Sequence, residues 1–145
     1  YLYYIRAYKA EEGAWLVMFF ILVTKMGDVG ALVTGKLLGR HILLQRISPR
    51  KTVEGFVGGV IVSAATAGLA HQMVARLQGS LWGGFALGLV LGVAAQIGDL
   101  AESLIKRDCQ VKDSGNLFPG LGGMLDVLDS LLFTAPLFYG FLIYG

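Results

Sequence analysis

Long apolar stretches, separated by short polar segments, dominate this chain. They run from about Ala14 to Leu38, Val53 to Leu77, Leu81 to Leu100 and Leu121 to Tyr144. A helix of about 20 apolar residues crosses the hydrocarbon core of a bilayer. Only 15% of the residues are charged, against roughly 25% in soluble domains. We therefore expect an all-α, polytopic integral membrane helical bundle with about four transmembrane helices.

The first residues have the composition of a membrane-interface segment. Tyr1–Glu12 passes from aromatic to charged residues, a pattern typical of the aromatic belt, and it does not resemble a signal peptide. We expect the chain to be the C-terminal part of a longer protein with further membrane helices. Residues 1–145 are then one membrane-embedded domain, and its one cysteine, Cys109, excludes an internal disulfide.

The cations of the chain gather in two polar loops. If the predicted helices alternate in direction, both loops lie on one side of the membrane, which is the cytoplasmic side by the positive-inside rule. Both chain ends then lie outside, and the net charge of +2 is too small to predict nucleic-acid binding. The loop cations are Lys36, Arg40, Arg46, Arg50, Lys51, Lys106, Arg107 and Lys112.

Glycines recur at every fourth position in two of the predicted helices. Gly84, Gly88 and Gly92 follow one another in the third apolar stretch, and Gly55 and Gly59 begin the second. Small residues at this spacing allow helices to approach closely in lipid. The pattern predicts helix packing rather than chemistry.

The first polar loop has the residues of an anion site. Ser48 and Pro49 predict the start of a helix, with Pro49 in its first turn. A helix N-terminus binds anions through its free N–H groups, so Arg50, Lys51 and Thr52 are candidates for holding a nucleotide phosphate. The alternative is a positive-inside loop that ends in an ordinary N-cap.

Acidic and basic side chains follow the third apolar stretch. On a helix, Asp99, Glu102 or Ser103, and Lys106 lie along one stripe. Glu102 and Lys106 fit an internally neutralised pair at the helix end. This interpretation explains Asp99 less well, because Asp99 directly follows an apolar run and lies deeper.

Two further aspartates, Asp126 and Asp129, begin the last apolar stretch and share one helix face. Carboxylates at the mouth of a lipid-buried helix usually have a function. Together with Asp99 they form a candidate Mg²⁺ site, because Mg²⁺ prefers carboxylate and phosphate oxygens. Two metals between such carboxylates are able to stabilise a phosphoryl-type displacement. The alternative is structural pairing with the neighbouring cations Lys106, Arg107 or Lys112.

Lys25 and Asp28 interrupt the first apolar stretch. They are about one helical turn apart, so they are able to form an ion pair within the helix. Alternatively, Asp28 reaches the predicted cytoplasmic site, since Lys36 and Arg40 close the same helix.

The motifs together resemble the signature of the phosphatidate cytidylyltransferases (CDP-diacylglycerol synthases). The resemblance extends from about Asp28 to Ser130, and the family order is kept. Leu121 and Val127 stand where the family usually has His and Arg, and Arg50 and Val53 are variants of a common family form. These departures leave room for an inactive relative. The segments are Gly27–Asp28, Gly35–Gly39, Ser48–Gly55, Ser103–Arg107, Lys112–Gly115, Phe118–Gly120 and Gly122–Ser130.

The resemblance implies that CTP and phosphatidic acid react to give CDP-diacylglycerol and pyrophosphate. It also implies a membrane-embedded catalytic domain, Mg²⁺ dependence with one or two metal ions (one monovalent in some members), and a homodimer. The location it implies is a bacterial-type inner membrane with the active site facing the cytoplasm. The site residues are then Asp99, Asp126 and Asp129 for metal; Lys106, Arg107, Lys112 and Asp113 for catalysis; and Ser48, Lys51, Thr52, Glu54, Gly122 and Gly123 for the nucleotide.

Other functions fit parts of the pattern. A related CTP-dependent membrane enzyme, such as a polyprenol kinase or an archaeal lipid cytidylyltransferase, would use similar residues on another lipid. A cation-coupled transporter would use Lys25, Asp28 and Asp99 as an intramembrane relay. Transport sites usually lie near the bilayer midplane, whereas the charges here gather at the predicted cytoplasmic boundary.

Overall fold

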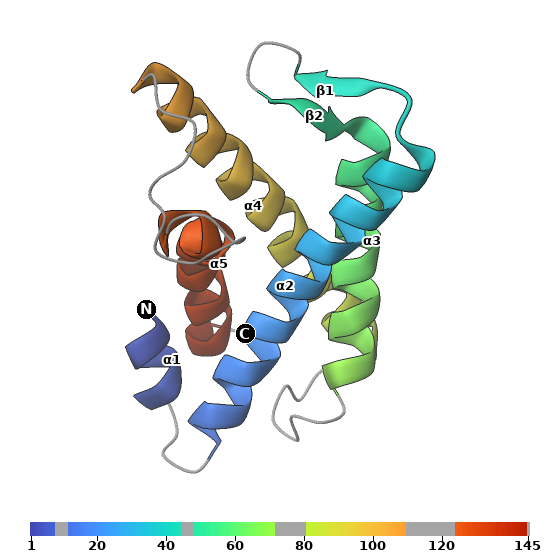
Figure 1. Cartoon of the computed structure of the whole chain (residues 1–145). Coiled ribbons are helices and arrows are strands. Elements are labelled where there is room, and N and C mark those ends of the chain that lie inside the picture. Colours follow the sequence, from blue (N-terminus) through green and yellow to red (C-terminus); the bar gives the residue numbers. More distant parts are fainter. Residues whose placement is uncertain (8–11, 45–47, 72–80, 110–123, 145) are drawn as a thin grey trace.

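A computed structural model of the chain describes residues 1–7, 12–44, 48–71, 81–109 and 124–144. The side chains of residues 49, 50 and 124–128 lie outside this description. Figure 1 shows a helical bundle with a small hairpin of strands at one end. In chain order, the elements are α1 (Leu2–Ala7), α2 (Gly13–Leu38), β1 (Ile42–Leu44), β2 (Ser48–Thr52), α3 (Val53–Ala70), α4 (Leu81–Asp108) and α5 (Met124–Tyr144).

Successive long helices pack side by side: α2 against α3, α3 against α4, and α4 against α5. The short α1 packs against both α2 and α5. By length and composition, α2, α3 and α4 are able to cross a membrane, and the described side chains of α5 add an apolar helix from Asp129 to Tyr144. The predicted all-α polytopic membrane bundle is confirmed. The predicted end of the second span, up to Leu77, lies outside the described residues.

The glycine pattern marks the contact between α3 and α4. A Cβ atom on Gly88 would lie 2.7 Å from the Cα atom of Ala64 and 2.6 Å from the Cβ atom of Ala67. One on Gly92 would lie 2.9 Å from the Cβ atom of Ser63. The two helix backbones therefore approach too closely for any side chain larger than hydrogen. The packing role predicted for these glycines is confirmed.

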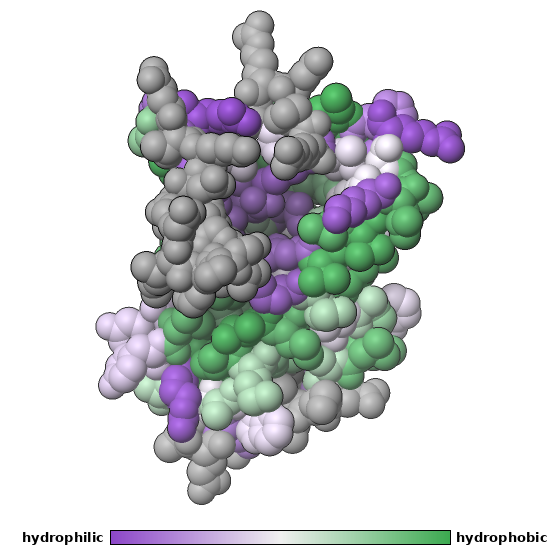
Figure 2. Space-filling model, in the orientation of Figure 1, coloured by the Kyte–Doolittle hydropathy of each residue, from purple (hydrophilic) through white to green (hydrophobic). Residues whose placement is uncertain are grey.

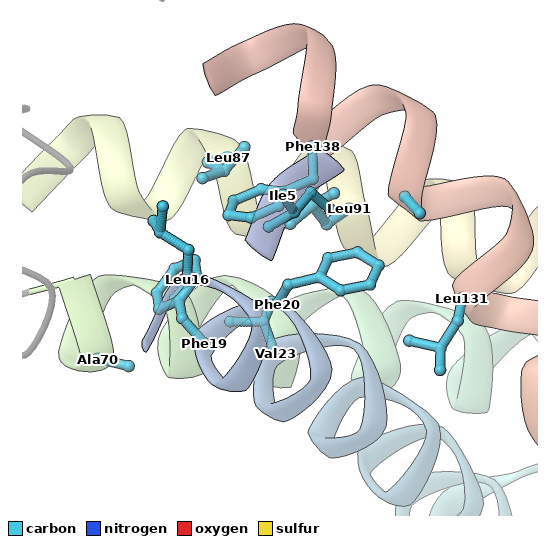
Figure 3. Close-up of a cluster of buried hydrophobic side chains, with 12 residues drawn as sticks. Ile5, Leu16, Phe19, Phe20, Val23, Ala70, Leu87, Leu91, Leu131 and Phe138 are labelled. Atoms are coloured by element: carbon cyan, nitrogen blue, oxygen red, sulfur yellow. The ribbon is translucent and has the colours of Figure 1, made fainter. Parts of the chain in front are cut away.

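Away from the hairpin, apolar side chains from all five helices form one cluster (Figure 3). The Phe138 ring of α5 stacks on Phe20 of α2, with the ring centroids 5.3 Å apart, and on Phe19 at 5.9 Å. Ile5 of α1 is fully buried against the same cluster. The buried members are Ile5, Leu16, Phe19, Phe20, Val23, Ala67, Ala70, Leu87, Leu91, Leu131, Ala135 and Phe138.

The prediction that Ser48 and Pro49 begin a helix is wrong. These residues belong to β2, which pairs antiparallel with β1. The helix begins four positions later, because the Thr52 Oγ1 atom accepts a hydrogen bond from the Gly55 N–H at 3.1 Å and caps α3. A proline lacks a backbone N–H but fits an edge strand, and both strands of a two-stranded sheet are edges.

Candidate functional site

Acidic side chains from α4 and α5 meet inside the bundle. Asp99, Glu102 and Asp129 each have a carboxylate oxygen within 4.8 Å of the others. The helices approach closely here, since a Cβ atom on Gly98 would lie 3.1 Å from the Asp129 carbonyl oxygen. Glu102 and Asp129 are buried, whereas Asp99 is one-third exposed. We call these three residues the carboxylate cluster.

Two lysines neutralise part of this charge. The Lys106 Nζ atom lies 3.2 Å from Glu102 Oε1, one turn along α4. The Lys51 Nζ atom of β2 lies 2.6 Å from Asp99 Oδ2 and donates a longer hydrogen bond of 3.4 Å to Ser103 Oγ. Among the described side chains, the cluster therefore combines three carboxylates with two paired ammonium groups. Lys51 also ties the hairpin to α4.

Glu54, in the first turn of α3, binds the segment between the end of α2 and β1. The Glu54 carboxylate accepts hydrogen bonds from the backbone N–H groups of Arg40 (3.1 Å) and His41 (3.2 Å). Its other oxygen lies 2.6 Å from His41 Nδ1, and the Val53 N–H donates to the His41 carbonyl. These contacts give Glu54 a structural role in the loop, and Thr52 caps α3 through its bond to the Gly55 N–H. Their predicted part in nucleotide binding stays a prediction.

A second polar group joins α2 to α5. The Lys25 Nζ atom lies 3.0 Å from Asp28 Oδ2 and donates a hydrogen bond of 3.0 Å to Ser130 Oγ. Ser130 in turn donates to Asp28 Oδ2 at 3.0 Å. The ion pair predicted for Lys25 and Asp28 is confirmed, and Ser130 is an additional partner. Asp28 is outside the carboxylate cluster.

One face of the molecule has hydrophilic side chains in a recess, behind the surface around them (Figure 2). Figure 2 shows hydrophilic side chains set back in the upper half of the molecule, with a hydrophobic surface directly below them. The hairpin and the C-terminal end of α4 lie at this same end of the bundle (Figure 1). A charged group that enters the recess is therefore close to a surface suited to lipid chains.

Comparison with known proteins places this arrangement in a family. The model of the "Cytidylyltransferase family" matches residues 3–144. The chain belongs to the cytidylyltransferase family. The match includes all of the carboxylate cluster, the hairpin and the Lys25–Asp28–Ser130 group.

Individual relatives are similar over most of the chain. The "Uncharacterized protein YnbB" of Escherichia coli (strain K12) is 42% identical over 137 residues, which are 92% of this chain and 44% of that protein. Proteins named "Phosphatidate cytidylyltransferase" from Staphylococcus saprophyticus and Bacillus subtilis (strain 168) are 43% and 41% identical, each over 94% of this chain and 51% of the relative. The chain thus spans about half the length of the curated relatives it matches.

The structure brings several predicted site residues together. Asp99 and Asp129 meet as expected, and Lys51 and Lys106 contact their cluster. Arg107 lies exposed at the end of α4, and Ser48 is half-buried in β2. Asp126 lies in the first turn of α5, but its side chain is outside the description. The other predicted residues outside the described ranges are Lys112, Asp113, Gly122 and Gly123.

Glu102 is a member of the cluster that sequence reasoning assigned to Lys106 alone. The signal was present, because Asp99 and Glu102 are three positions apart and share a helix face. The structure shows both contacts at once: Glu102 pairs with Lys106 and also lies against Asp99 and Asp129. The spacing in the sequence predicts that Asp99 and Glu102 share a face of α4. The contact of that face with Asp129 depends on how α5 packs against α4.

The cluster fits a hard divalent cation. All its donors are carboxylate oxygens, which Mg²⁺ prefers, and they come from two helices that pack closely. Burying carboxylates together is unfavourable without a compensating positive charge. Lys51 and Lys106 supply part of that charge, and a metal ion would supply the rest.

Proposed function

We propose that this chain is the catalytic part of an enzyme that transfers the CMP moiety of CTP to phosphatidic acid, giving CDP-diacylglycerol and pyrophosphate for phospholipid biosynthesis. The observation that carries the proposal is the carboxylate cluster, with paired lysines, at the polar end of a lipid-embedded bundle. Family membership supports nucleotidyl transfer. The names of relatives about 40% identical to this chain support phosphatidate as the acceptor.

The reaction exchanges one phosphoanhydride bond for another. A phosphate oxygen of phosphatidic acid forms a bond to the α-phosphorus of CTP, and the bond from that phosphorus to the β-phosphate oxygen breaks. Pyrophosphate leaves with the bonding electrons. The nucleophile is already an anion, so no strong general base is required. The main barrier is the repulsion between two highly charged phosphate groups.

The residues of the chain divide this work between them. Asp99, Glu102 and Asp129 would hold Mg²⁺, which lowers the repulsion by screening phosphate oxygens. Lys51 and Lys106 already lie at the cluster and are placed to pair with phosphate oxygens. We also assign metal binding to Asp126, phosphate contacts to Arg107 and Lys112, and a catalytic role to Asp113. Nucleotide contacts are assigned to Ser48, Thr52, Glu54, Gly122 and Gly123.

The lipid substrate stays in the bilayer while its phosphate reacts. The hydrophobic surface beside the polar recess (Figure 2) suits the acyl chains. We propose a bacterial-type inner membrane, with the site facing the cytoplasm, because the described loop cations lie at the hairpin end of the bundle. A homodimer, which the family resemblance implies, is part of the same proposal and is testable by cross-linking in membranes.

The test is pyrophosphate release by the full-length protein in detergent–lipid micelles. CTP, phosphatidic acid and Mg²⁺ are supplied together, and each is then omitted in turn. We expect release only with all three, loss of release in Asp126→Asn, and normal release in Asp108→Asn, which alters an exposed carboxylate at the end of α4. Release of CDP instead of pyrophosphate would identify a kinase and contradict the proposal.

A further inference from the structure

The Lys25–Asp28–Ser130 group joins the first long helix to the residue that follows Asp129. Each of its three contacts, Lys25 with Asp28, Lys25 with Ser130 and Ser130 with Asp28, is 3.0 Å long. Ser130 is fully buried, whereas Lys25 and Asp28 are each about one-third exposed. All three lie outside the carboxylate cluster, and the proposed chemistry gives none of them a role.

The Lys25–Asp28 ion pair forms within α2 and does not require a contact with α5. Lys25 and Asp28 are on one helix face and neutralise each other, so the pair alone removes most of the cost of two charges in an apolar span. The contact to Ser130 is therefore an addition. It anchors α5 at the position next to a cluster member, and the Ser130 N–H also donates to the Asp129 Oδ1 atom.

A second anchor lies further along α5. Phe138 stacks on Phe20 of the same helix α2, about 12 Å from Ser130 along the axis at 1.5 Å per residue. Two separated contacts to one neighbour restrict the rotation of a helix about its own axis more than one contact does, and here they act together with the packing of α5 on α4. The rotation of α5 decides whether Asp129 points at Asp99 and Glu102 of α4.

We propose that Lys25, Asp28 and Ser130 form a positioning unit that holds Asp129 in the carboxylate cluster. The unit acts on the cation site through the orientation of α5, and no member of it touches the substrate. Groups that orient metal ligands commonly change metal affinity or activity by about 10- to 100-fold when they are removed. The inference rests on the proposed function only through the use of a divalent cation.

The experiment measures Mn²⁺ binding to the full-length protein by electron paramagnetic resonance, without CTP or lipid substrate. The variants are Lys25→Met, Ser130→Ala and Lys25→Arg. Lys36→Met is the matched control, because Lys36 is an exposed lysine on the same helix. Circular dichroism and gel filtration establish which variants fold, and Ser130→Ala, which removes a single oxygen, serves if Lys25→Met does not.

We expect Lys25→Met and Ser130→Ala to weaken Mn²⁺ binding by about 10- to 100-fold, with Lys36→Met unchanged. Lys25→Arg should keep most of the affinity, since it retains a cation that is able to donate to both partners. The Lys25→Met and Ser130→Ala double variant should lose little more Mn²⁺ affinity than the single variant with the larger loss, as expected for one unit. In turnover assays, the half-saturating Mg²⁺ concentration should rise while kcat at saturating Mg²⁺ recovers.

Folded variants that bind Mn²⁺ like the wild type would overturn the inference, even if their activity fell. So would a wild-type protein that binds no Mn²⁺. The proposed function can fail separately. If Mn²⁺ binding depends on Lys25 and Ser130 but the protein releases no pyrophosphate from CTP and phosphatidic acid, the positioning unit stands and the proposed reaction is excluded.

Discussion

Glu102 differs from its neighbour Asp99 in how deeply it is buried. The Glu102 side chain is 7% exposed, and that of Asp99 is 34% exposed. A buried carboxylate with one lysine partner is a sufficient structural unit, so pairing with Lys106 alone would account for its position. In the proposed cation site, its closeness to Asp99 and Asp129 would give it a second task, which is to add an oxygen ligand.

Substitution separates these two tasks. We expect Glu102→Gln to lower kcat by about 10²–10³-fold, comparable to removal of one electrostatic donor in an active site (about 2.7–4 kcal/mol). Steady-state pyrophosphate release measures the effect, with Asp108→Asn as the matched carboxylate-to-amide control on α4. A folded Glu102→Gln protein with near-normal kcat would restrict Glu102 to its pair with Lys106.

For single residues, the sequence indicates which side chains are functional candidates better than it indicates which residues they contact in space. Asp99 and Asp129 are recognisable because each stands at the edge of an apolar stretch, where a carboxylate is costly. Lys51 is recognisable only as a loop cation. Its contact with Asp99 depends on where β2 lies relative to α4, and no local pattern encodes that distance.

Among the elements, the contact between α3 and α4 is sensitive to small changes in side-chain size. Its close approach depends on residues without side chains, and in lipid such packing replaces the hydrophobic effect as the source of helix association. The spacing of Gly84, Gly88 and Gly92 predicts this contact correctly from the sequence, because a repeat of four keeps small residues on one face.

Gly88→Ala should therefore destabilise the bundle. Its new methyl group would meet the Ala64 Cα atom at 2.7 Å and the Ser63 carbonyl oxygen at 2.7 Å, and overpacking of this kind costs about 1–3 kcal/mol. Thermal unfolding in detergent measures the loss. Gly83→Ala is the control, since nothing lies within 4 Å of its Cβ position; an equal loss in both variants would contradict the packing argument.

The hairpin is the element that sequence reasoning missed. β1 has three residues and β2 five, too few for a reliable alternating pattern. Ser48 followed by Pro49 is also a common helix start. The tertiary hydrogen bonds of Glu54 to Arg40 and His41 decide the outcome, because they fold the chain back before α3 begins.

For the whole molecule, the order of the helices and their direction in the membrane depend on different features of the chain. The long helices and their order follow from the apolar stretches, because a lipid environment permits few alternatives for a backbone that must satisfy its own hydrogen bonds. Direction rests on charge alone. The hairpin and the end of α4 lie at the same end of the bundle (Figure 1), so one label at this end reports the side of the membrane on which both lie.

Cys109 is a suitable attachment site for that label. It is exposed directly after α4. A membrane-impermeant maleimide should modify it in inside-out vesicles and leave it unmodified in intact spheroplasts, with Cys109→Ser identifying the signal. Labelling in spheroplasts but not in inside-out vesicles would reverse the proposed orientation.

The length of the apolar part of α4 indicates how deep in the membrane the proposed site lies. From Leu81 to Gly98 it measures about 27 Å at 1.5 Å per residue, close to the roughly 30 Å thickness of a hydrocarbon core. Asp99 is the next residue, so an α4 helix that crosses along the membrane normal would place it where the lipid tails end. A thicker bilayer would draw the carboxylates into hydrocarbon, and a thinner one would lift them into water. For the proposed reaction, we therefore expect the catalytic rate to depend on the thickness of the host membrane.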